Sequence, residues 1–432
     1  AASQPEEGES PLSEQGESPL YERLGVPKHW VYSGASSDGK VSIDADIDID
    51  LPNVEKVPVA QVQMRRFNET DLKNVARVLF GPDAQFTLPE SMTKEGFQRA
   101  LEGAKESLAY YEGQDEQDPD VIALTKRYIQ NCEILLERAP AEDGERKIPL
   151  ALSDQIDITS EIVPGFTGIT ELDGYKFQYT LMNEMAYAAY EKGEASYIYA
   201  SMDESGYSGF YGTVKEAPEG VLLTKEQAAL QAKAIAAQLT DDLELCVVAP
   251  VHGNKAYGRK EGWACVFART VNGVPAAYDS KDVNSDLYYD VPFAQLNEQM
   301  TIVMDDFGVA DFQWVDPMAV TQIEQEDAAL LSFDQVLAKM PDALRAKLGQ
   351  SGESWQKYAV TVQFGLMRIG AGGSGSYTLE PVWDFFFSSD QEQEAVQDIE
   401  QRNALLGGYP QAWDALTLSA LDGRVIDRNW GY

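Results

Sequence analysis

The residues best suited to chemistry in this sequence begin with a run of alternating aspartates. They are Asp44, Asp46, Asp48 and Asp50, in a stretch rich in Ile and Ala. Counted from Asp44, Glu55 stands at the twelfth position, where a calcium-binding loop has its last ligand. The sixth position is Ile49, however, and that loop needs glycine there for its sharp turn. The alternation therefore predicts a half-buried strand with a carboxylate outer face, and a calcium site is the alternative.

The two histidines give little support for catalysis or metal binding. His29 lies near the N-terminus and His252 in an expected loop, and neither has a partner at metal-ligand spacing. We expect no metal on either residue and no catalytic triad, since the chain has no Gly-x-Ser-x-Gly elbow. Residues 370–375 match Gly-x-Gly-x-x-Gly, but they join two expected strands, so they predict a hairpin loop and no dinucleotide site. No catalytic, cofactor-binding or metal-binding residue is assigned.

The three cysteines all lie in apolar patterns. Cys132 is on an expected helical stripe, while Cys246 and Cys265 lie within expected strands. Three cysteines in 432 residues do not make a disulfide framework, so they predict small core residues. A Cys246–Cys265 bridge between neighbouring strands is the alternative.

The charge of the chain restricts its partners. Its 71 acidic and 34 basic residues give a net charge of -37. Nucleic-acid binding needs a basic footprint, and anionic lipid attracts basic segments, so neither is an expected partner. The hydrophobic content of 44% is enough for a substantial core, and the length predicts two or three domains.

The N-terminal segment is predicted to be a disordered acidic tether over residues 1–24. Residues 1–22 contain six glutamates and no Lys or Arg, and Gly-Glu-Ser-Pro-Leu occurs at 8–12 and again at 16–20. Such a stretch cannot bury enough apolar surface to order itself. No apolar run is long enough to span a membrane, and the chain opens without Met. We expect a trimmed extracellular protein whose only membrane link is a removed N-terminal lipid anchor.

Residues 25–218 are predicted to form an N-terminal α+β domain. Strand-like alternation at 41–63 is followed by a helical hairpin, with apolar stripes at 97–111 and 122–136. Short alternating runs from 153 to 214 then predict a β-meander. Aromatic residues share faces of this meander: Tyr175, Phe177 and Tyr179 on one, Tyr197 and Tyr199 on another. These faces predict core packing, and a peptide- or glycan-binding surface is the alternative.

The C-terminal half repeats one pattern, a capped helix followed by strands. Thr224 and Ser332 each have a glutamine three residues later, as in a capping box. Pro341 is expected to break the second helix. Turns are expected at Asn272-Gly273 and Asp422-Gly423. The pattern predicts two tandem modules, 219–328 and 329–432, each a helix packed on an antiparallel sheet.

Several segments of this half resemble a known family. They are residues 222–228, 267–275, 330–337, 379–385 and 418–427. In them the chain resembles PepSY-like modules and the YycI-type regulatory proteins of Gram-positive envelopes. The whole chain is similar to uncharacterised secreted lipoproteins of gut clostridia. The resemblance implies two PepSY-like modules and an envelope location. The chain lacks the N-terminal transmembrane helix of those regulators, so direct control of a membrane kinase is not implied.

These observations together predict a non-enzymatic protein that acts outside the cytoplasmic membrane. It is expected to bind or regulate an envelope protein or peptide without a cofactor, and a glycan is the alternative ligand. The candidate contact residues are Trp314, Trp383 and Trp430, because aromatic anchors contribute strongly to protein interfaces. Core packing is the alternative role for each of these tryptophans.

Overall fold

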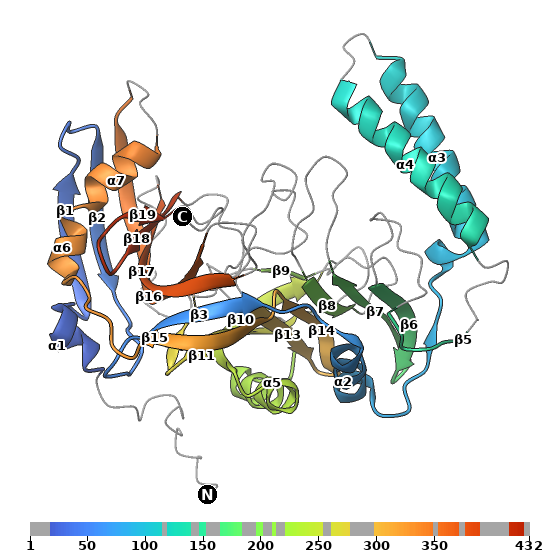
Figure 1. Cartoon of the computed structure of the whole chain (residues 1–432), viewed down its shortest axis with the longest axis horizontal. Helices are drawn as coiled ribbons and strands as arrows, with labels where there is room; N and C mark the ends of the chain where they lie inside the picture. The colour runs from blue at the N-terminus through green and yellow to red at the C-terminus, as the bar shows by residue number, and fades with distance from the viewer. Residues whose placement is uncertain are drawn as a thin grey trace, which may run out of the picture.

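The computed structural model has an α+β fold with two large sheets (Figure 1), which confirms the predicted fold class. The structure describes residues 18–114, 119–139, 147–152, 165–183, 196–201, 210–212, 221–253, 261–276, 298–348, 353–370, 376–388 and 414–426.

Sheet A is built from the two ends of the described chain. Its strands are β1 (His29–Ala35), β2 (Val41–Asp48), β3 (Val59–Met64), β15 (Met318–Gln325), β16 (Trp355–Ile369), β17 (Ser376–Ser388), β18 (Asp414–Ser419) and β19 (Val425–Ile426). The strand order is β1-β2-β16-β17-β18-β19, and β3 pairs with both β15 and β17. Neighbours are antiparallel except β2 and β16, which are parallel. Segments far apart in sequence therefore form one sheet.

Sheet B is built from the middle of the chain. Its strands are β4 (Phe86–Thr87), β5 (Lys147–Ile148), β6 (Gly165–Leu172), β7 (Tyr175–Asn183), β8 (Ser196–Ser201), β9 (Phe210–Gly212), β10 (Leu243–Gly253), β11 (Gly262–Val271), β12 (Val274–Pro275), β13 (Gln299–Asp305) and β14 (Gly308–Val315). The order is β5-β4-β6-β7-β8-β14-β13-β11-β10-β9, with β12 paired to β11. The expected Tyr-rich meander is present as β6, β7 and β8.

Four of the helices, α2, α3, α5 and α6, start at a residue whose side chain caps them. They are α1 (Leu20–Leu24), α2 (Glu69–Phe80), the 3-10 turn η1 (Glu90–Met92), α3 (Lys94–Glu112), α4 (Pro119–Arg138), α5 (Lys225–Leu239), α6 (Phe333–Leu337) and α7 (Met340–Lys347). Capping boxes at Thr224 and Ser332 are confirmed. Pro341 lies in the first turn of α7 and separates it from α6, because proline cannot continue a helix that needs its N–H.

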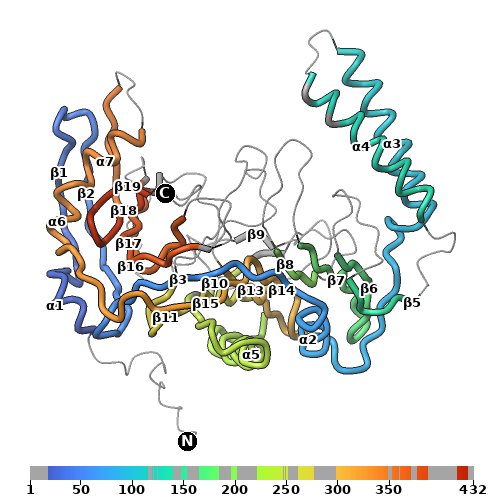
Figure 2. The backbone as a smooth tube through the Cα atoms, viewed as in Figure 1, coloured from blue at the N-terminus to red at the C-terminus, as the bar shows by residue number. Residues whose placement is uncertain are grey.

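The middle of the chain is inserted into sheet A between two neighbouring strands. Strand β3 leads out of sheet A and β15 leads back, and the two pair antiparallel. At the junction the Arg65 N–H donates to the Pro317 carbonyl over 2.7 Å. Figure 2 shows the result: blue β1 and β2 lie beside orange-to-red β16 to β19 at one end, and green β6, β7 and β8 lie towards the other.

This grouping differs from the boundaries expected at residues 218 and 328. Strands of the 25–218 segment divide between the sheets, β1 to β3 in A and β4 to β9 in B. Within the C-terminal half the expected order does hold. Helix α5 precedes the antiparallel meander β10-β11-β13-β14, and α6 with α7 precedes the antiparallel meander β16-β17-β18-β19.

The expected tether does not extend through residues 18–24. These residues include α1, whose Leu20 and Leu24 are buried in the core of sheet A. The two leucines are four positions apart, so they share one face of the short helix. The remainder of the expected tether, residues 1–17, lies outside the described residues.

Two hydrophobic cores hold the sheets, and one hairpin links them. The core of sheet A includes Trp383, Phe385 and Phe333. Val271 and Val274 of the β11–β12 hairpin are also buried in that core, although β11 belongs to sheet B. The expected tight turn at Asn272-Gly273 is confirmed, with positive φ at both residues. The hairpin thus packs one sheet against the core of the other.

Within the described residues, the helices that pack on sheet B lie on one side of it. Figure 1 shows α2 and α5 against the same face, while the α3–α4 hairpin projects beyond the end of the sheet. Buried residues of α2 and α5, including Leu72, Val75, Ala228 and Ala232, belong to the sheet B core. Among the described residues, no helix combines the length and apolar character needed to cross a membrane.

Candidate functional site

The two faces of sheet B differ in composition. The face under α2 and α5 is aromatic and apolar: it contains Tyr179, Phe267, Phe312 and Trp314, all buried. Because side chains alternate along a strand, the residues between these point to the opposite face. That opposite face carries a small buried apolar cluster of Val251, Ala264, Val303 and Ala310, and polar side chains gather on the rest of it.

A row of neutral polar side chains runs across this open face. The strand register aligns one residue from each of β6, β7, β8, β14 and β13: Thr167, Thr180, Tyr199, Gln313 and Thr301. We call these five residues the polar row. At about 4.8 Å between neighbouring strands the row is roughly 19 Å long. Thr180 is buried, and the other four side chains are half-buried.

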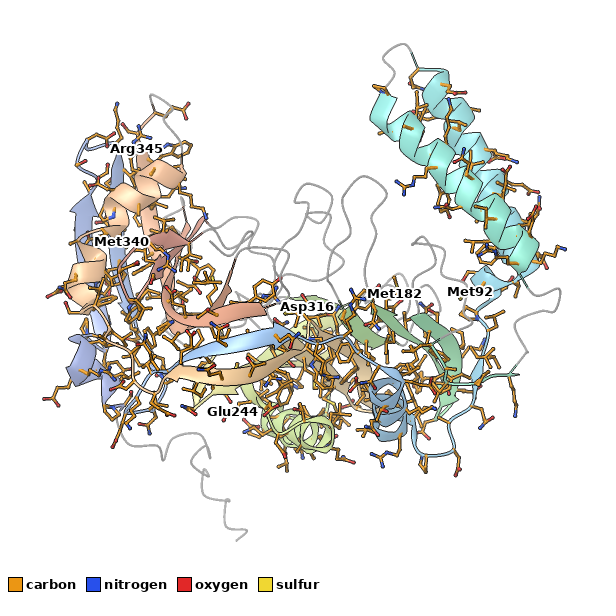
Figure 3. The ribbon with its side chains drawn as sticks, viewed as in Figure 1. Met92, Met182, Glu244, Asp316, Met340 and Arg345 are labelled. Carbon is orange, nitrogen blue, oxygen red and sulfur yellow. The ribbon has the colours of Figure 1, made fainter. Side chains whose placement is uncertain are left out.

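Hydrogen bonds and ring stacking hold part of the row in place. The Thr180 hydroxyl donates to the Thr167 hydroxyl over 3.2 Å, and the Gln178 amide donates to the Tyr199 hydroxyl over 2.8 Å. The Tyr197 and Tyr199 rings stack with centroids 5.7 Å apart and planes 24° apart. The Tyr197 hydroxyl also contacts the Met182 sulfur at 2.8 Å. Figure 3 labels Met182 on the side of sheet B away from α2.

The meander therefore divides its aromatic residues between two roles. Phe177 and Tyr179 are buried, and the Tyr179 hydroxyl donates to the Leu72 carbonyl over 2.6 Å. Burial raises the pKa of the Tyr179 phenol well above its ordinary range. Tyr175 is exposed and lies against Phe307, with centroids 5.2 Å apart. Core packing explains the aromatic residues on the face under α2 and α5. Tyr197 and Tyr199 lie on the opposite face, with the polar row.

The α3–α4 hairpin is a second exposed feature, and it confirms the predicted helical pair. Four of its large apolar side chains are exposed: Tyr110, Tyr111, Tyr128 and Ile134. Tyr110 and Tyr111 lie in the last turn of α3 with ring centroids 5.6 Å apart. Ion pairs Lys105–Glu133, at 3.2 Å, and Lys126–Glu112, at 2.8 Å, link the helices.

The alternating aspartates form the predicted strand face. Ile43, Ala45 and Ile47 of β2 are buried, and the intervening aspartates point outward. His29 lies between two of them, with Nδ1 2.9 Å from Asp48 and Nε2 3.0 Å from Asp46. The hydrogen bond to Asp48 raises the pKa of His29. Within the described residues, no group of three His, Cys, Asp or Glu side chains is placed to hold a metal ion.

His252 lies in a strand rather than the expected loop. It belongs to β10, where its backbone is opposite Tyr211 of β9. Pairing at the edge of sheet B extends the strand through His252 and Gly253 instead.

The candidate tryptophans that can be located are core residues. Trp383 is fully buried, with its ring centroid 4.9 Å from both Phe333 and Phe364. Trp314 is 4% exposed and packs edge-on against Phe67. Trp430 lies outside the described residues. Burial of Trp314 and Trp383 favours the core role that the sequence left open for them.

The cysteines are free, so the Cys246–Cys265 bridge is not formed. Strand register places Cys265 opposite Val248, and Cys246 lies at a β-bulge between Leu245 and Val247. Burial raises the pKa of both thiols to about 12. Cys132 is a buried residue of α4, as predicted.

A buried charge cluster was not foreseen from the sequence. The Arg269 guanidinium pairs with Glu298, which is fully buried, and also contacts Asp242 at 3.2 Å. Glu298 accepts hydrogen bonds from the Trp314 indole at 3.2 Å and the Met318 N–H at 3.0 Å. Burial raises the pKa of Glu298, although Arg269 opposes that shift. Since Met318 begins β15, the cluster ties sheet B to sheet A.

Comparisons with known proteins give little further identification. No protein-family profile matches the sequence, and no curated protein matches it. One solved structure with a similar chain is an uncharacterised protein from Eubacterium rectale, at 12% identity and a TM-score of 0.43. The similarity covers 93% of this chain and 94% of that one.

Proposed function

We propose that this protein is a non-enzymatic binding protein of the cell envelope that acts by contact with a partner protein. The observation that carries the proposal is the α3–α4 hairpin, which projects from sheet B with four large apolar side chains exposed (Figure 1). Exposed tyrosines supply large contact area with a polar end, which suits them to interfaces.

The hairpin is built to hold its distal residues in place. Its base is anchored by Met92, Phe97 and Leu135, which are buried together. The two ion pairs between the helices lie farther along and add modest support, as exposed pairs do. A partner would therefore meet Tyr110 and Tyr111 on a preformed helical end, with little ordering cost.

Charge also favours this region as the contact. Helices α3 and α4 contain six basic and seven acidic residues, a net charge of -1, whereas the whole chain carries -37. Long-range repulsion of an acidic partner is therefore weakest at the hairpin. This supports the hairpin over the strongly acidic outer face of β2 as the place of contact.

The proposal includes the envelope location and the PepSY-like modules. The acidic composition of residues 1–17, which precede the folded Ser18 and Leu20, supports an extracellular tether that ends in an N-terminal lipid. The two helix-then-meander units support tandem PepSY-like modules, since both have the expected connectivity. This part of the proposal is analogy at the level of fold.

Site-specific photo-crosslinking in cells tests the partner contact. A photoreactive residue replaces Tyr111, and the control carries it at Leu230, which is 71% exposed on α5. We expect one dominant protein adduct from position 111 and none from position 230. The Tyr110→Ser, Tyr111→Ser double variant should compete for that partner at least about tenfold less well than wild type. Equal adducts at both positions, or turnover of a defined substrate by the purified protein, would contradict the proposal.

A second function, ligand binding by the Tyr-rich meander, is favoured by one specific observation. Tyr197 and Tyr199 stack on the open face of sheet B, within a row of neutral hydroxyl and amide groups. This surface is separate from the hairpin, so the two functions do not exclude each other.

A further inference from the structure

The polar row has the chemistry of a site for an uncharged, hydroxyl-rich ligand. Every member carries a hydroxyl or an amide, and each of these groups both donates and accepts hydrogen bonds. None of the five side chains is charged. Asp311, two residues from Gln313 on the same face, is buried at 6% exposure. A polyhydroxylated ligand can therefore be matched by hydrogen bonds along the row without an ion pair.

The direction of the row argues against recognition of a peptide by strand addition. Strands β7, β8, β14 and β13 have a paired neighbour on each side, whereas β6 pairs with β7 along one side and with β4 only at Ile169 on the other. The backbone groups of the four inner strands are therefore engaged within the sheet, and strand addition needs an open edge. A ligand on the row must lie across these four strands and be recognised there by side chains.

Tyrosine rings add an apolar component to the row. Tyr199 is held by the Gln178 amide and stacked on Tyr197, so its ring has a fixed position. A sugar ring offers C–H groups as well as hydroxyls, and a tyrosine offers an apolar ring with a polar end. The stacked pair beside hydroxyl and amide groups can satisfy both parts of such a ligand.

Charge restricts the ligand further. A chain with a net charge of -37 repels anionic polymers at long range. The row itself contains no cation that would compensate for that repulsion. An acidic polysaccharide is therefore disfavoured compared with a neutral one.

We infer that the polar row binds a neutral, extended glycan that lies across β6, β7, β8, β14 and β13. The inference rests on the second function proposed above and names its ligand class. The row is roughly 19 Å long, so its four half-buried members can contact several consecutive sugar units, while the buried Thr180 hydroxyl holds Thr167 in place.

Affinity electrophoresis with soluble polysaccharides tests the inference. The neutral probes are mixed-linkage β-glucan, arabinoxylan, galactomannan and soluble starch, and the anionic probe is polygalacturonate. Wild-type protein should be retarded by at least one neutral probe, and the Tyr199→Ala, Gln313→Ala variant should lose about tenfold or more in affinity. The matched control is Tyr175→Ala, which removes an exposed tyrosine of the same meander outside the row. Thermal melting confirms that each variant is folded.

Salt dependence separates this contact from a charged one. Retardation by the neutral probe should be unchanged between low and high salt, because no ion pair is screened. Retardation by polygalacturonate alone, equal loss in Tyr175→Ala, or no retardation by any neutral probe would overturn the inference. Binding to a peptide array that is lost in the row variant would overturn the glycan class while supporting the ligand-binding function. If neither glycans nor peptides bind, both fail.

Discussion

Sheets A and B bury their side chains in different ways. On β17, the central strand of sheet A, residues on both faces are buried, including Trp383 and Phe385 on one and Val382 and Phe386 on the other. On β8 of sheet B, Ile198 and Ala200 are buried while Tyr197 and Tyr199 are half-buried. Strand β17 therefore offers little accessible surface to a ligand on either face of sheet A. Sheet B packs one face under its helices, and its other face leaves Tyr197 and Tyr199 partly accessible; on this other face we propose recognition.

The largest effect is expected from the doubly buried sheet. Trp383→Ala removes a fully buried ring that packs on Phe333 and Phe364, and should lower the free energy of unfolding by about 3–5 kcal/mol. Urea titration followed by circular dichroism measures the change. Tyr199→Ala, on the open face of sheet B, should cost less than about 1 kcal/mol. Equal losses for the two variants would contradict the division between the sheets.

The link between the sheets should also be costly to break. Glu298→Gln removes the buried counter-charge of Arg269 and leaves only the exposed Asp242, so the free energy of unfolding should fall by about 3 kcal/mol. Arg269→Met with Glu298→Gln removes both charges but keeps an acceptor for the Trp314 indole and the Met318 N–H, and should recover most of that loss. Chemical denaturation of the single and double variants gives the comparison. A double variant as unstable as the single one would show that the pair has another role.

A smaller effect follows from two thiols on sheet B, the buried Cys265 and the half-buried Cys246. Burial raises the pKa of Cys246 and Cys265 to about 12, so neither thiol should be alkylated by iodoacetamide at pH 8 while the protein is folded. In urea, all three cysteines should react. The unfolded chain releases these protons at lower pH than the folded chain. Their contribution to stability is therefore full below the ordinary pKa of 9.0 and is lost as pH rises towards 12.

Rapid labelling of Cys246 in the folded protein would show that the β-bulge opens. The urea midpoint measured at pH 8 and again at pH 10 provides the second check. The urea midpoint should fall from pH 8 to pH 10. A rise would contradict the expected loss of stability as the pH increases.

The smallest effect should come from the exposed histidine of sheet A. The hydrogen bond to Asp48 raises the pKa of His29, so its contribution is present below the ordinary pKa of 6.5 and is lost as pH rises through the folded value. His29→Asn should therefore reduce the melting temperature slightly at pH 5 and hardly at all at pH 8. Calorimetry at the two pH values measures this, and a larger loss at pH 8 would contradict the ion pairs described.

Local signals in the sequence predicted local structure well. The capping boxes at Thr224 and Ser332, the turn at Asn272-Gly273 and the break at Pro341 are confirmed, since each depends on a few neighbouring residues. Alternation likewise placed the outward carboxylates of β2 correctly. Such signals determine where a helix, strand or turn forms and which of its faces is buried. They do not determine which strand pairs with it.

Strand partners could not be read in the same way. The parallel pairing of β2 with β16 joins residues more than 300 positions apart, and β3 beside β15 closes an insertion. The polar row also depends on strand pairing that the sequence did not reveal. Sequence identified Tyr197 and Tyr199 as one face, but Gln313 and Thr301 join them only through the register of β8, β14 and β13. For Trp314 and Trp383 the residue type alone suggested contact with a partner. The strand pairing instead places both side chains in the hydrophobic cores.

Hydroxyl-radical footprinting with and without the retarding neutral polysaccharide tests the central claim most directly. The claim is that the open face of sheet B recognises a ligand while sheet A maintains the fold. We predict that the ligand protects Tyr197 and Tyr199 from oxidation, leaves exposed Tyr175 unchanged, and finds Trp383 unreactive in both states. Equal oxidation of Tyr199 with and without the ligand, or protection confined to Tyr175, would contradict it.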